Sequence, residues 1–182
     1  MWTRFWIRRW KSSGNCRSDI AKTGETGYIP FRLHRRHFFV NCYGDQDLLK
    51  LPKTAFFCSR TIPAEEILRT YDWARDQRKT GRCIISGFHS AIERDVFEIL
   101  LKGSQPIIWV LARGLYKKWP DGIQKAVENN RMLVISAYDL NCIRPNRKRC
   151  LERNLFVASH CDEIYNITTG GLKKQYAPKS EI

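Results

Sequence analysis

Several turns in the sequence carry the small, hydroxylated and basic residues that an anion-binding site requires. Three of them follow short apolar runs and contain the sequences Cys58-Ser-Arg60, Ser86-Gly-Phe-His-Ser90 and Ala112-Arg-Gly114, and a fourth contains Thr168-Thr-Gly-Gly171. Glycine lets the backbone approach a phosphate, amides at a helix N-terminus donate to it, and arginine binds it through two parallel hydrogen bonds. These turns therefore predict a site for phosphate groups.

The candidate phosphate-binding residues come from these turns and from a basic segment at residues 143–154. That segment has five basic side chains and one acidic one, which is consistent with a solvated loop or with a surface that follows a phosphate backbone. The candidates are Ser59, Arg60, Ser86, Gly87, His89, Ser90, Arg113, Gly114, Arg153, Asn154, Gly170 and Gly171.

Support for catalysis is weaker. His89 could serve as a base for a nearby serine, but no G-x-S-x-G sequence surrounds any of the serines. Glu93 stands three residues after Ser90, which is the spacing of a helix capping box, and this favours capping over general-base catalysis. The chain also lacks the G-x-G-x-x-G and G-x-x-x-x-G-K-[ST] sequences of nucleotide cofactor sites. We therefore expect no catalytic residue and no cofactor.

Short apolar runs alternate with helical segments. We expect strands at residues 54–58, 82–86, 106–111, 132–135 and 163–167, and helices at about 61–80, 90–103, 123–128 and 148–159. The runs are continuously apolar, so both faces of each strand should be covered, as in a parallel sheet. The sequence predicts an α/β fold of the Rossmann-like, doubly wound kind, with a mainly parallel sheet and helices on both faces.

In such a sheet the carboxyl ends of the strands share one edge, where ligands bind. The candidate turns should therefore converge. In the first helix, the three- and four-residue spacing of Ile67, Leu68, Tyr71 and Ala74 predicts that these side chains face the core.

The chain has 182 residues and a formal net charge of +14, which favours a polyanionic partner. Residues 1–40 hold 9 basic and 2 acidic side chains. We expect them to form a basic, disordered extension, although the spacing of Trp2, Phe5, Trp6 and Trp10 also fits an amphipathic helix on a membrane or nucleic acid. Residues 45–176 should form one domain and residues 177–182 a tail.

The cysteines, histidines and apolar segments bear on the cellular compartment, on metal binding and on membrane insertion. The seven cysteines include no C-x-x-C pair and follow no secretory signal, so we expect free thiols in a reducing cytoplasm. The four histidines lack zinc-ligand spacing to any cysteine pair, and no stretch approaches about 18 apolar residues. We expect neither a metal site nor a membrane span.

The order of these motifs resembles the Rossmann-like core of the DprA/Smf proteins, DNA-processing proteins of natural transformation within the SLOG superfamily. The resemblance covers about residues 48–171 and is closest to a short, single-domain branch that carries an S-G-F-H-S turn. The sequence departs from the usual family pattern at Cys58 (glycine), Ser90 (arginine), Glu93 (aspartate) and Leu155 (arginine).

The resemblance implies binding of single-stranded DNA during DNA-mediated transformation. It also implies a recombinase partner in the longer members, and a homodimer. Two alternatives stay open: a sensor of a free nucleotide, and a nucleotide N-glycosidase like the Lonely-guy proteins. The P-G-G-x-G-T-x-x-E signature of that enzyme is absent, because no glutamate follows Thr168-Thr-Gly-Gly171 at that spacing.

Overall fold

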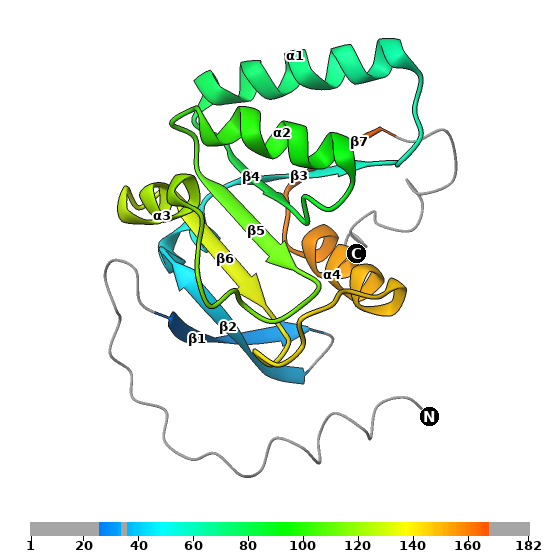
Figure 1. The fold of residues 1–182 in the computed structure, drawn as a ribbon. Helices are drawn as coiled ribbons and strands as arrows, with labels where there is room; N and C mark the ends of the chain where they lie inside the picture. The colour runs from blue at the N-terminus through cyan, green and yellow to red at the C-terminus, as the bar shows by residue number, and fades with distance from the viewer. Residues whose placement is uncertain (1–25, 34–35, 168–182) are drawn as a thin grey trace, which may run out of the picture.

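The computed structural model describes residues 26–33 and 36–167, and every structural statement below refers to them. They form a seven-stranded sheet with helices on both sides (Figure 1). The strands are β1 (Thr26–Leu33), β2 (Arg36–Gly44), β3 (Lys53–Cys58), β4 (Cys83–Ser86), β5 (Ile107–Leu111), β6 (Met132–Ser136) and β7 (Glu163–Ile167). The helices are α1 (Ala64–Thr80), α2 (Ala91–Leu101), α3 (Asp121–Glu128) and α4 (Arg147–Ser159), with a short 3₁₀ helix, η1 (Gln46–Lys50).

The strand order in the sheet is β1-β2-β6-β5-β4-β3-β7. Strands β3 to β7 are parallel, whereas β1 and β2 are antiparallel to their neighbours. From β3 the chain advances strand by strand to β6 and then returns through α4 to place β7 on the other side of β3. Helices α1, α2 and α3 cover one face and α4 the other. The predicted fold class is confirmed.

Each central strand buries side chains on both faces, which is why its sequence is continuously apolar. In β4, Ile84 packs toward α1–α3 and Ile85 toward α4, and neither is exposed. In β5, Ile107 and Ile108 divide in the same way. Burial of one such side chain contributes about 1.5–3 kcal/mol, so strands β3 to β6 contribute strongly to the stability of the apolar core.

The sheet begins earlier in the chain than the sequence analysis predicts. Strands β1 and β2 form an antiparallel hairpin, and β2 continues the sheet by pairing with β6. The expectation that residues 1–40 are disordered is therefore wrong for the residues in these two strands. Residues 1–25 lie outside the described part of the chain. Pro30 interrupts the strand pattern, but β1 is an edge strand, where a sheet tolerates proline.

In α1, the prediction that Leu68 faces the core is wrong. Ala74 is buried as expected, but Leu68 is 64% exposed. Thr70 takes an inward position instead, and its hydroxyl donates to the Glu66 carbonyl at 2.6 Å. Such a bond hides the polarity of threonine inside a helix, so a pattern of apolar residues does not detect this position. No helix among the described residues is both long and apolar enough to cross a bilayer.

Candidate functional site

The candidate turns follow the carboxyl ends of three parallel strands. Ser59 and Arg60 follow β3, residues 87–90 follow β4, and Arg113 and Gly114 follow β5. The strands are parallel neighbours, so these turns share one edge of the sheet. Figure 1 shows α4, which carries Arg153 and Asn154, next to the arrowhead of β5. Gly170 and Gly171 lie outside the described residues.

Arg153 lies against the turn that follows β4. Its guanidinium Nη1 donates to the Gly87 carbonyl at 3.2 Å, and its Nε donates to Asn154 Oδ1 at 2.8 Å. The indole of Trp109, on β5, donates to the same Gly87 oxygen at 3.1 Å. A side chain on residue 87 would overlap the guanidinium, which explains the glycine. Arg153 is only 7% exposed and forms no ion pair with a described residue.

His89 marks the point where the positive charges converge. Burial lowers the pKa of its imidazole, and the nearby charge of Arg153 lowers it further, with smaller effects from Arg60 and Arg94. The carboxylate of Glu93 acts in the opposite direction. We call Arg60, His89, Arg94 and Arg153 the basic cluster. Sequence reasoning missed Arg94, and the available signal was its place in the first turn of α2, beside the S-G-F-H-S motif.

Glu93 holds the base of this site together. Its carboxylate accepts backbone hydrogen bonds from Cys58 at 3.2 Å, His89 at 2.7 Å and Ser90 at 3.0 Å. The Ser90 hydroxyl accepts in turn from the Glu93 amide at 3.2 Å, so the predicted capping box is confirmed. Glu93 therefore occupies the His89 and Ser90 amides at the start of α2, which could otherwise bind a phosphate.

Cys58 stands where the resembling family has glycine. Burial, and then the charge of Glu93, raise the pKa of its thiol to about 11. The thiol is therefore protonated at neutral pH, and a protonated thiol is a poor nucleophile. Among the described residues, no group of three or more His, Cys, Asp and Glu side chains is placed to hold a metal ion.

Two serine hydroxyls, at the carboxyl ends of β4 and β6, hold the following turns through the same kind of hydrogen bonds. The buried Ser86 hydroxyl donates to the Phe56 carbonyl at 2.7 Å and accepts from the Phe88 amide at 3.3 Å. At the end of β6, the Ser136 hydroxyl donates to the Arg113 carbonyl at 2.6 Å and accepts from an amide two residues ahead at 3.1 Å. Both hydroxyls are engaged inside the protein and position the turns.

The turn after β4 is held in a strained conformation. Phe88 has a φ of +43°, which is unusual for a residue other than glycine. Its ring is buried and packs on Phe97, with ring centroids 4.7 Å apart. Strain of this kind persists only where surrounding contacts over-determine the backbone, which is common at binding sites. The buried ring thus fixes the backbone that presents His89.

The turn after β5 combines basic and aromatic side chains. The Arg113 guanidinium lies 4.2 Å from the centre of the Tyr116 ring, and Trp119 packs edge-on against Tyr116 and stacks on Tyr43. The Gly114 amide donates to Cys142 at 2.8 Å, so this glycine holds the loop after β6 in place. The Ser59 amide likewise donates to Ile167 at 3.0 Å and extends the pairing of β3 with β7.

The first turn of α4 violates a rule of helix electrostatics. It contains Arg147, Lys148 and Arg149 and no acidic residue, although the positive end of a helix dipole disfavours cations. Asn146 caps the helix by accepting from the Arg149 amide at 2.9 Å. Arg149 and Arg153 are four residues apart and share a helix face. The basic turn therefore extends the positive surface of the basic cluster along α4.

Two solved structures are similar to this one. DNA processing protein A from Helicobacter pylori, whose structure was described for its single-stranded DNA binding mode, has a TM-score of 0.63 and 21% identity, covering 84% of this chain and 75% of its own. DNA processing protein A from Streptococcus pneumoniae has a TM-score of 0.57 and 23% identity, covering 70% of this chain and 45% of its own. At these identities the likeness shows a shared fold.

Comparison with curated proteins yields no match. A family model described as DNA recombination-mediator protein A matches residues 31–170. This region contains the described turns and the basic cluster. The chain therefore belongs to the DNA recombination-mediator protein A family.

Proposed function

We propose that this protein binds single-stranded DNA and that phosphates of the strand lie on the basic cluster. The observation that carries the proposal is the placement of Arg60, His89 and Arg153 at the carboxyl edge of the sheet, where the Arg153 guanidinium donates to the Gly87 carbonyl in the turn that holds His89. The charges of Arg153, Arg60 and Arg94 each lower the pKa of His89. The family assignment supports it, as does the binding of single-stranded DNA by the similar protein from H. pylori.

The chemistry of the basic cluster suits phosphate oxygens. Arginine presents a planar fork of donors that binds phosphate through paired hydrogen bonds. Glu93, the one carboxylate among the charges that act on His89, is engaged by three backbone amides. Arg60 and Arg94 are exposed, and no described carboxylate forms an ion pair with either. Both side chains are therefore available to an external anion.

The surroundings of the cluster suit a strand rather than a single phosphate. Arg149 lies one helical turn before Arg153 on α4, and Arg147 is exposed in the first turn of the same helix. On the side of β5, Tyr116 and Trp119 are partly exposed beside Arg113. Basic grooves with aromatic side chains for stacked bases are typical of proteins that bind single strands without sequence preference.

The salt dependence of binding to a labelled oligothymidine, measured by fluorescence anisotropy, tests this proposal. Contact with about four phosphates predicts a roughly 50-fold loss of affinity between about 50 and 200 mM salt. Arg60→Ala and Arg94→Ala should each reduce the salt slope by about 0.7. Arg75→Ala is the control, because Arg75 is an exposed arginine paired with Asp72 on α1. An affinity that does not change with salt would contradict the proposal.

The finer parts of the function concern the fate of the strand. We propose that the protein acts in the cytoplasm and passes the strand to a recombinase, as the family description implies. The free thiols of the described cysteines support a reducing compartment. Faster assembly of recombinase filaments on DNA coated with single-strand-binding protein tests the partnership. We also propose that the protein forms a homodimer, which sedimentation of the full chain tests.

A further inference from the structure

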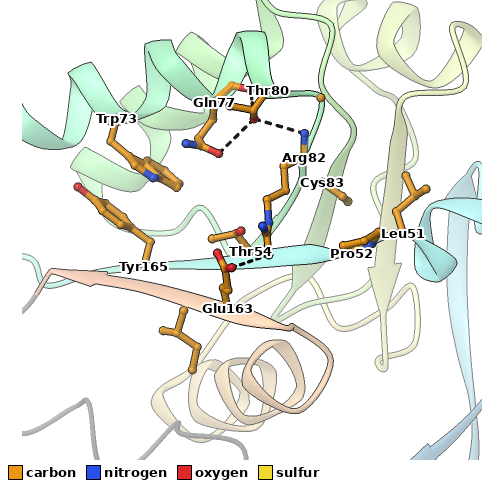
Figure 2. A pocket seen from close by; sticks show the side chains of 12 residues that line it. Leu51, Pro52, Thr54, Trp73, Gln77, Thr80, Arg82, Cys83, Glu163 and Tyr165 are labelled. Carbon is orange, nitrogen blue, oxygen red and sulfur yellow. Dashed lines mark hydrogen bonds and ion pairs between the residues drawn. The ribbon is translucent and has the colours of Figure 1, made fainter.

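A second candidate site lies at the opposite edge of the sheet, where β3, β4 and β7 begin. It is a pocket of about 620 Å³ between the end of α1 and these strands (Figure 2). This volume is in the range of small-molecule sites, about 300–1,000 Å³. Parallel strands begin at the edge opposite to the one where they end, so the pocket is separate from the basic cluster.

One wall of the pocket is aromatic. Trp73 of α1 and Tyr165 of β7 stack with ring centroids 4.1 Å apart and an angle of 2° between the rings. Phe56 lies behind them, 5.2 Å from the Trp73 ring. Leu51 and Pro52 line the opposite side (Figure 2). A flat aromatic ligand would find a rigid, apolar frame here.

The polar groups of the pocket are few and incompletely paired. Arg82 Nη2 pairs with Glu163 Oε1 at 3.0 Å, but the buried Arg82 Nε has no hydrogen-bond partner. Thr54 is only 5% exposed, and its hydroxyl bonds to no described residue. A buried donor without a partner costs free energy. Arg82 Nε therefore has no acceptor inside the described part of the protein.

Glu163 and Gln77 complete the polar set. The Glu163 carboxylate has one oxygen that no described residue engages. The Thr80 hydroxyl donates to the Gln77 carbonyl at 3.1 Å and lies 3.4 Å from Gln77 Oε1, and the Gln77 NH₂ group has no partner among the described residues (Figure 2). The charges of Arg82 and Glu163 balance, so the pocket favours a neutral ligand that has both donors and acceptors.

We propose that this pocket binds the guanine base of a nucleoside. Guanine offers the acceptors O6 and N7 on one edge and an amino donor on another, which complement the Thr54 hydroxyl and the Gln77 NH₂ group on one side and the free oxygen of Glu163 on the other. Adenine and uracil do not combine these groups in that way. Because the charges of Arg82 and Glu163 balance, the pocket should not favour a nucleotide, with its phosphate, over the nucleoside. The proposal is independent of DNA binding at the basic cluster.

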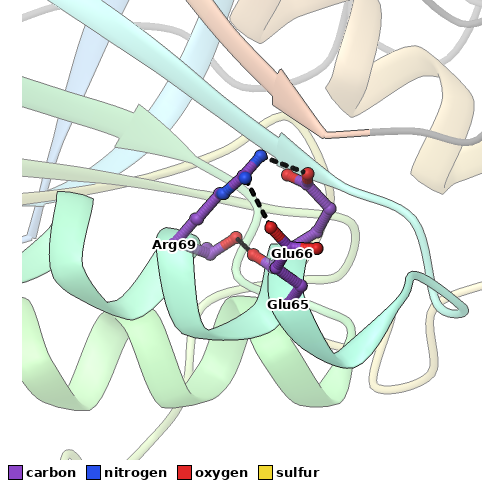
Figure 3. Close-up of polar contacts among 4 residues, drawn as sticks. Glu65, Glu66 and Arg69 are labelled. Carbon is purple, nitrogen blue, oxygen red and sulfur yellow. Dashed lines mark hydrogen bonds and ion pairs between the residues drawn. The ribbon is translucent and has the colours of Figure 1, made fainter.

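Isothermal titration of the full chain with guanosine, adenosine and uridine tests this proposal. Guanosine should bind at least tenfold more tightly than the other two nucleosides. Glu163→Gln should weaken guanosine binding at least tenfold, and Thr54→Val, which keeps the size of the side chain, should weaken it severalfold. Glu65→Gln is the matched control, because Glu65 pairs with Arg69 near the start of α1 and lines no part of this pocket (Figure 3).

The outcomes separate this proposal from DNA binding. Arg60→Ala should weaken oligothymidine binding and leave guanosine binding unchanged. If guanosine does not bind, if the three nucleosides bind alike, or if Glu163→Gln and Glu65→Gln have equal effects, the proposal is overturned. Thr54→Val provides the test if loss of the Arg82 pair prevents Glu163→Gln from folding.

Discussion

The guanidinium of Arg153 and the carbonyl of Gly87 meet across the candidate site, 66 residues apart in the chain, at a distance of 3.2 Å. The contact joins α4 to the turn after β4. Because Arg153 is 7% exposed, its charge cannot turn away into solvent. The absence of a side chain at Gly87 thus decides where this charge lies.

Gly87→Ala should therefore weaken binding of single-stranded DNA as much as Arg153→Ala does. The added methyl group would occupy the place of the guanidinium and displace it. The double variant should bind single-stranded DNA no more weakly than either single variant, because both substitutions remove the same contact. Anisotropy titrations with oligothymidine measure all three affinities.

A matched glycine controls for the effect of the extra methyl group. A Cβ at Gly122, on α3, would meet no atom within 4 Å, so Gly122→Ala should leave DNA affinity unchanged. If the losses from Gly87→Ala and Arg153→Ala add in the double variant, the two residues act independently and the prediction is wrong.

Glu93→Gln should destabilise the protein by about 3 kcal/mol, because the charged carboxylate accepts three backbone hydrogen bonds that an amide cannot reproduce. Urea denaturation measures the loss. Glu98→Gln, at an exposed position on the same helix, should change stability little.

Neither the wild type nor Glu93→Gln should release free base from nucleoside monophosphates. Release by the wild type that disappears in a folded Glu93→Gln protein would instead assign Glu93 a catalytic role.

The elements that local sequence determines could be predicted. Ser90 and Glu93 specify the start of α2 through their spacing alone, and the apolar runs specify β3 to β6 because both faces of these strands are buried. The hairpin of β1 and β2 has no such signal. Its place in the sheet depends on pairing with β6, about 90 residues later, and this pairing is not visible in a local pattern.

The candidate site was predictable only in outline. Parallel strands imply that their carboxyl ends meet at one edge, and this placed the turns correctly. The sequence does not show that Arg94 joins Arg60 and Arg153 around His89, because these residues come from four different elements. Nor does it show that the Glu93 carboxylate also accepts from the Cys58 amide at the end of β3. Both facts depend on how α2 and α4 pack on the sheet.

The affinity for single-stranded DNA should rise as the pH falls below about 6.5 and stay constant above about 7. Burial and the neighbouring arginines lower the pKa of His89 from its usual 6.5, so the imidazole is neutral at neutral pH. A bound phosphate favours the protonated form, so acid pH adds one positive charge to the complex. His89→Gln should remove this increase.

Stability should change in the opposite direction. A histidine whose pKa is lowered by folding is protonated first in the unfolded chain, so its contribution to stability is lost as the pH falls below about 6.5. His160 tests the assignment, because burial lowers its pKa too, but it lies just before β7 at the other edge of the sheet. Loss of the acid-side gain in affinity in His160→Gln, and not in His89→Gln, would refute the role of His89.

Arg147→Glu should make the protein more stable and its DNA binding weaker. An acidic side chain in the first turn of α4 interacts favourably with the helix dipole, by about 0.3–1 kcal/mol. The same change removes a cation from the surface that we propose for the strand. Lys125→Glu changes the net charge equally but lies in the last turn of α3, where the dipole favours a cation. It should lower stability and leave DNA affinity nearly unchanged; equal losses of affinity in the two variants would mean that overall charge, and not contact with α4, attracts the strand.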